Sequence, residues 1–211
     1  MPSLADWSRH LRQVAQPVLE ASPRPAGFAT GPLDPPLLAV LDGVDPGPAP
    51  SPLSADEIGL WWRRALDPGA AATGELLDRV RTSNAADRAV DGGGALLPRD
   101  LYSAIEVWTD AELAALHAWW WLAEAADDDD ARAHLARIRD WHLEHTQPDN
   151  ATNRPWAIHV FLLGATPEHE HYAATLLHNG LAMDGVPTPL GARLLRDAAD
   201  AIDRAAALPA P

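Results

Sequence analysis

Histidines are the side chains of this sequence whose type and spacing best suit chemistry, and seven of the nine lie between residues 134 and 178. Neutral imidazole is the commonest metal ligand, and its pKa near neutrality also suits acid–base catalysis. Helical periodicity predicts that five of these rings point into a helical core: His142, His145, His159, His171 and His178.

Buried imidazoles need polar partners, because an unpaired polar ring in a core costs a few kcal/mol. One interpretation gives these five rings backbone carbonyls, Tyr172 and Asn179 as partners. The alternative is a divalent metal ion held by two or three of them. The first interpretation is favoured, because no carboxylate is placed to complete a metal set. No other cofactor is expected.

A second concentration of polar groups lies in the connector that follows the helix ending near His145. Its candidate ligand-binding residues are Asp149, Asn150, Asn153 and Arg154, flanked by His145 and Trp156. Asp149 and Arg154 could hold a ligand, with His145 as acid or base. The favoured alternative is that the Asp and Asn side chains cap two helix ends while Arg154 pairs with Asp149.

Several chemistries are excluded by residue types or motifs that the sequence lacks. It has no Cys, which excludes thiol catalysis, thiolate metal sites and disulfides. It also has no Lys, which excludes Schiff-base chemistry and the P-loop lysine. Neither a Gly-x-Ser-x-Gly elbow nor a His-Glu-x-x-His string occurs.

The charge balance also narrows the classes of partner. The chain has 16 Arg and 30 Asp and Glu residues, so its formal net charge is −14, which argues against a nucleic-acid partner. The acidic run Asp127–Asp130 is typical of a helix N-terminus and predicts that role rather than a metal clamp. No apolar stretch is long enough to span a bilayer, and no signal peptide is evident, so we expect a cytoplasmic protein.

The elements that must position these groups are helices, and the predicted fold class is all-α. The pattern indicates about 7–8 helices stacked as antiparallel hairpins. Capping boxes predict helix starts at Ser54–Glu57 and Thr109–Glu112. Between these starts, Pro98 opens a helix with one apolar stripe: Leu101, Tyr102, Ile105 and Trp108.

The last three helices are predicted from how apolar and polar residues are distributed around each helix axis. The segment from about Arg154 to Gly164 is apolar all round, which predicts a central buried helix. His169, with two glutamates beside it, is expected in a solvated cap at the start of the next helix. The final helix begins at Thr188–Pro189 and is amphipathic, with Arg193 expected on its outward face.

The N-terminal quarter differs in composition. Ser3 and Asp6 predict a helix start, and ten prolines follow between residues 17 and 52. Within that stretch, Asp34–Gly43 predicts one short helix with prolines at its start. We therefore expect an N-terminal helix and Pro-rich arm over residues 1–53, packed on a single helical domain over 54–211.

One motif carries a family resemblance. Trp141, Gln147–Asn150 and Trp156 surround a helix–helix junction that resembles the turn of α/α-toroid repeats in terpene-cyclase and prenyltransferase-like proteins. Asn150 stands where those repeats usually have Gly. The resemblance implies stacked helical hairpins and transfers no active site.

The tryptophan content allows two interpretations. Because the chain has nine Trp but only two Phe and two Tyr, we expect Trp to serve mainly as the large core residue, although Trp-rich faces could also bind a protein partner or a second copy.

Two classes of function follow from the sequence. The favoured class is a non-enzymatic binding or structural protein, because no nucleophile–base–orienter set is visible. The alternative is a small enzyme, or a small-molecule- or metal-binding protein, that uses the histidines and the polar loop over residues 147–155.

Overall fold

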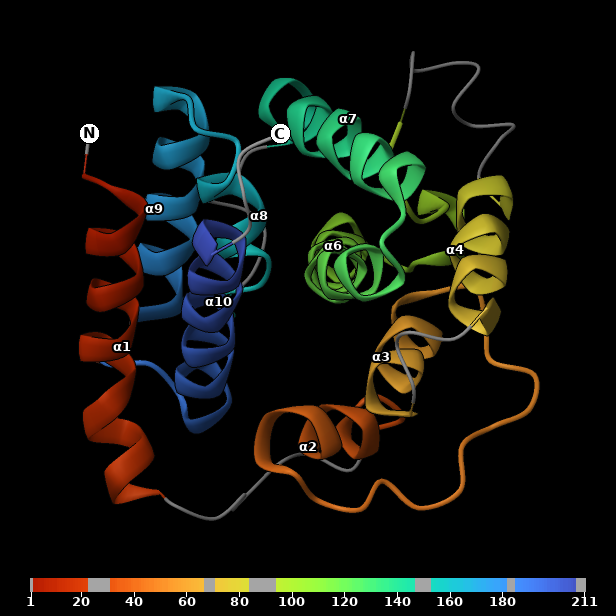
Figure 1. Ribbon diagram of the computed structural model, residues 1–211, viewed down its shortest axis with the longest axis horizontal. Helices are drawn as coiled ribbons and strands as arrows, with labels where there is room; N and C mark the ends of the chain where they lie inside the picture. Colours follow the sequence, from red (N-terminus) through yellow and green to blue (C-terminus); the bar gives the residue numbers. More distant parts are fainter. Residues whose placement is uncertain are drawn as a thin grey trace. The chain divides into compact units, whose positions relative to one another are not determined.

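The computed structural model describes residues 2–22, 31–66, 71–83, 94–146, 153–181 and 185–207. Over these ranges the chain is helical and contains no β-strand, so the predicted all-α class is confirmed (Figure 1). None of the described helices is long and apolar enough to cross a membrane. The antiparallel hairpins and the Pro-rich arm stay predictions.

The chain forms two compact units. The first combines both ends of the sequence, Met1–Phe28 and Pro148–Pro211, and the second is the continuous segment Ala29–Gln147. The predicted boundary at residue 53 does not coincide with this division. The N-terminal helix belongs with the C-terminal helices because it packs along the last of them.

The first unit is organised by α1 (Leu4–Ala21) and α10 (Pro189–Ala207), which lie side by side (Figure 1). Both predicted starts are confirmed. Ser3 and Asp6 form a capping box, and the Thr188 hydroxyl accepts a hydrogen bond from the Gly191 amide at 3.0 Å. An ion pair of 2.8 Å between Arg12 and Asp203 links the two helices.

Two predictions for this unit are wrong. The apolar helix expected from Arg154 to Gly164 is buried as predicted but is only α8 (Ile158–Leu162), because Ala157 adopts a left-handed φ of 52° and the helix begins after it. Arg193 does not face outward. Arg193 is buried, and its guanidinium donates hydrogen bonds to the Pro189 and Ser22 carbonyls at 2.9 and 3.1 Å. Backbone oxygens at the start of α10 and the end of α1 therefore stabilise the buried charge.

In the second unit, α6 (Ile105–Ala126) is the central helix and packs against its neighbours (Figure 1). The other helices that the structure describes in this unit are α2 (Asp34–Asp42), α3 (Glu57–Leu66), α4 (Ala71–Ser83) and α7 (Asp129–His145), with a 3-10 turn, η1, at Arg99–Leu101. The predicted short helix is confirmed as α2, which has prolines in its first turn and a left-handed Gly43 after its end.

Sequence patterns misplaced three helix starts in this unit. The spacing of Thr109 and Glu112 imitates a capping box, yet both residues lie inside α6. The helix expected from Pro98 is instead η1 followed by an extended stretch before α6. The start of α3 is shifted as well, because the Asp56 carboxylate, rather than Ser54, accepts from the Gly59 amide at 2.9 Å.

Tryptophan is mainly a core residue in the described chain. Six of the nine are buried: Trp61, Trp62, Trp108, Trp119, Trp120 and Trp156. The Trp61 and Trp119 indoles donate to backbone carbonyls at 3.0 Å, which satisfies their N–H groups inside the core. The prediction of a Trp-rich binding face stays a prediction, although little Trp surface is left to form one.

Candidate functional site

The predicted polar loop lies mostly outside the described residues, including Asp149 and Asn150 and the Gln147–Asn150 motif of the toroid resemblance. Asn153 and Arg154 are exposed, whereas Trp156 is buried. The ligand-binding role of this loop therefore stays a prediction.

The five candidate metal histidines divide between the two units, with His142 and His145 in one and His159, His171 and His178 in the other. The prediction that all five point inward is wrong. Only His142 and His159 are buried, while His145, His171 and His178 are exposed. Among the described residues, no group of three or more His, Asp and Glu is arranged to hold a metal ion.

His169 is buried, contrary to the predicted solvated cap. Its ring lies so close to Gly164 that a Cβ at that position would stand 2.5 Å from the imidazole Cγ. The Nδ1 atom is 2.7 Å from the Thr166 hydroxyl. This ring therefore belongs to the tight packing between α8 and α9 (Pro167–Leu181).

The second unit contains a buried pair that the sequence did not reveal, Glu112 on α6 and His142 on α7. Both side chains are fully buried, and Glu112 Oε1 lies 3.4 Å from His142 Nε2. The same carboxylate accepts hydrogen bonds from the backbone amides of Leu96 and Leu97, the latter at 2.7 Å. Glu112 thus holds the segment before η1 against the central helix.

Both ring nitrogens of His142 have polar neighbours in the core. The Thr146 hydroxyl donates to the His142 carbonyl at 3.0 Å and lies 2.9 Å from the ring Nδ1, while Nε2 faces Glu112. The pair formed by Glu112 and His142 is therefore enclosed in the core, with polar contacts at both ring nitrogens.

Close to this pair in the sequence lie residues 99–107, which are exposed except for the half-buried Tyr102 and which we call the α6 head. Its three large aliphatic residues are exposed: Leu101 by 74%, Val107 by 50% and Ile105 by 41%. From Trp108 to Trp120 the same helix is buried at nearly every position. The predicted stripe is thus wrong for Leu101 and Ile105, because the chain leaves η1 in an extended conformation before α6 begins.

Tyr102 in the α6 head is hydrogen-bonded to a carboxylate. Its hydroxyl donates to Glu57 Oε2 at 2.9 Å. Burial raises the pKa of Glu57, and the charges of Asp56 and Asp110 raise it further. Burial also raises the pKa of Tyr102, as do the charges of Glu57, Asp56 and Glu112. We call Asp56, Glu57, Asp110 and Glu112, together with Tyr102, the Tyr102 cluster.

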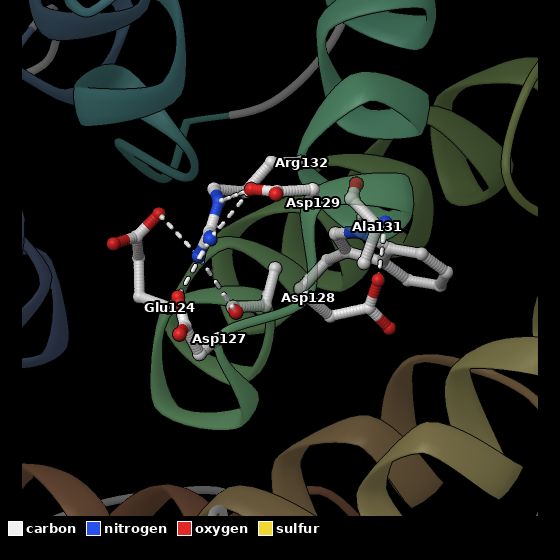
Figure 2. Close-up of polar contacts among 8 residues, drawn as sticks. Glu124, Asp127, Asp128, Asp129, Ala131 and Arg132 are labelled. Carbon is white, nitrogen blue, oxygen red and sulfur yellow. Dashed lines mark hydrogen bonds and ion pairs between the residues drawn. The ribbon is translucent and has the colours of Figure 1, made fainter. Parts of the chain in front are cut away.

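A second acidic region lies at the turn between α6 and α7 (Figure 2). Asp128 caps α7 by accepting from the Ala131 amide at 2.9 Å, which confirms the predicted helix-start role of the run Asp127–Asp130. Arg132 lies 2.8 Å from both Asp127 and Asp129, and these bonds raise its pKa.

A pocket of about 460 Å³ opens beside this turn, lined by Ala71, Gly74 and residues 126–130. Three of its four aspartates already have structural roles, since Asp128 caps α7 and Asp127 and Asp129 pair with Arg132.

No protein-family model, curated protein or solved structure matches this chain. Sequence reasoning missed Glu57, Tyr102 and Glu112. The one available signal was Glu112, an acid in a run of apolar residues that continues to Leu122.

Proposed function

We propose that this chain is a non-enzymatic, soluble cytoplasmic protein that works by binding a protein partner through the α6 head. The observation that carries the proposal is the exposure of Leu101, Ile105 and Val107 on one short stretch. Single exposed apolar residues are ordinary, whereas three large ones within residues 101–107 are a concentration that favours an interaction site.

The structural role of the buried polar groups in the second unit also supports a non-enzymatic binding protein. An imidazole beside a carboxylate could serve as an acid–base pair, but Glu112 and His142 are enclosed and engaged with backbone amides and Thr146. A general base must come within hydrogen-bond reach of its substrate. This pair instead fixes the backbone that leads into the α6 head, which suits a rigid binding surface.

The experiment compares affinity capture by three purified proteins: the original chain, the double variant Leu101→Ser/Ile105→Ser, and the control Val186→Ser. Val186 is also exposed but lies in the first unit. All three should melt at similar temperatures, because the replaced side chains contribute little buried area.

We expect a partner that the original chain and the control retain equally and that the double variant binds at least tenfold more weakly, measured by titration with the purified partner. Equal binding by all three proteins would contradict the proposal. Sedimentation velocity on the same samples tests a second copy of the chain as the partner.

A further inference from the structure

Carboxylates gather beside Tyr102 at the α6 head. Glu57 Oε2 accepts a hydrogen bond from the Tyr102 hydroxyl at 2.9 Å, and the charges of Asp56, which precedes α3, and of Asp110 on α6 act on Glu57. Desolvation strengthens such interactions, because the effective dielectric constant falls on leaving bulk water. The apolar residues of the head therefore lie within a field that favours cations.

More acids extend this field along the exposed stretch. Asp100 precedes Leu101, and Glu106 lies between Ile105 and Val107, both exposed. Glu106 and Asp110 are four residues apart on α6, so their side chains share one face of the helix. Apolar and acidic side chains thus alternate over the same few residues, with Arg99 as the basic residue of the head.

Resting on the function proposed above, we propose that the partner docks through a cationic amphipathic segment. Its aliphatic side chains pack on Leu101, Ile105 and Val107, and its Arg or Lys side chains meet the exposed acids Asp100 and Glu106 and the half-buried Asp110. Complementary charge of this kind raises association rates and selects against other partners.

A second copy of the chain fits this surface poorly. In a two-fold dimer the same patch meets itself, so Glu106 and Asp110 would approach the like charges of the partner copy. The formal net charge of −14 adds long-range repulsion between copies. A second copy would increase the repulsion among these carboxylates, whereas a cationic segment reduces it.

The test uses three defined helical peptides of equal length and the full chain. One carries Leu on one face and Lys and Arg on the other. Its twin has Glu in place of every basic residue, and the third keeps the basic residues but has Ser in place of Leu. Fluorescence anisotropy should show the basic amphipathic peptide binding at least tenfold more tightly than either of the others, with an affinity that falls as salt rises.

Matched variants separate the site from the overall negative charge. Glu106→Gln/Asp110→Asn should weaken binding of the basic amphipathic peptide at least fivefold. Asp127→Asn/Asp129→Asn removes the same formal charge at the α6–α7 turn and should change it less than twofold. Leu101→Ser should weaken it as well.

Three results would overturn the inference: equal binding of the acidic twin, equal weakening by both double variants, or no binding of any peptide. None of them decides whether the α6 head binds a partner, because the capture experiment with Leu101→Ser/Ile105→Ser measures that separately.

Discussion

Two acidic regions of the second unit use the same kind of side chain in opposite ways. At the α6–α7 turn the carboxylates are in water, with Asp127 and Asp129 more than nine-tenths exposed, and Arg132 and the α7 N-terminus compensate their charge. In the Tyr102 cluster, Glu57 is partly buried and Glu112 fully buried, and their hydrogen-bond donors are a phenol and backbone amides.

The difference teaches that the position of an acid in the fold, rather than its neighbours in sequence, decides what it contributes. Exposed acids at a helix start stabilise the helix modestly, because water screens them. A buried carboxylate is costly unless it is satisfied, and a satisfied one fixes the groups that surround it. Each prediction below measures one side of this contrast.

The largest effect is expected at Glu112. Glu112→Ala leaves the Leu96 and Leu97 amides buried without their acceptor and should lower the free energy of unfolding by about 2–5 kcal/mol. Glu112→Gln keeps one carbonyl oxygen and should cost less. Chemical denaturation measures both, with Glu106→Ala as a control at an exposed position of the same helix. A loss below about 1 kcal/mol for Glu112→Ala would contradict the role given to this carboxylate.

The acidic turn should respond more weakly. Asp128→Ala removes the side chain that caps α7 and should cost about 1 kcal/mol, as is usual for an N-cap. Asp129→Ala, next in sequence and exposed, should stay within about 0.5 kcal/mol. If Asp129→Ala were the more damaging, the pairing with Arg132 rather than the cap would be what stabilises this turn.

Sequence patterns within a few residues correctly predicted the helix caps and the fold class, which depend on interactions between near neighbours in the chain. The α1 cap at Ser3, the α10 cap at Thr188, the acidic start of α7 and the all-α class followed from spacing and propensity. Glu112 was misassigned because Thr-x-x-Glu looks the same at a helix start and inside a long helix. Its partner His142 lies 30 residues away, a separation that no local pattern reports.

Face assignments failed for a related reason. Periodicity correctly groups His171 with His178 on one face of α9, but it does not say which face the neighbouring helices cover. Packing covers the face of Tyr172 and Leu176 instead. The exposure of the α6 head was not predicted, because its apolar residues fit the stripe of one continuous helix. In the structure, residues 102–104 between η1 and α6 are not helical.

The smallest and most diagnostic effect concerns Glu57. Its pKa in the folded chain lies above the ordinary value of 4.5, mainly because of burial, so the folded protein holds the proton more tightly than the unfolded chain does. Stability should therefore fall as pH rises through the window between those two pKa values. Above that window, Glu57→Gln removes an ionised group that the fold disfavours, while its side-chain oxygen still accepts from Tyr102.

Glu57→Gln should therefore raise the melting temperature at pH 8, and the gain should disappear once the pH falls below 4.5, where Glu57 is protonated in both states. Glu106→Gln removes the same formal charge from an exposed position and should give a smaller gain. A gain of equal size in both variants would mean that overall negative charge, not burial beside Tyr102, destabilises the chain. A pH-dependent gain confined to Glu57 would show that desolvation beside Tyr102 sets this carboxylate apart from Glu106, an exposed acid of the α6 head.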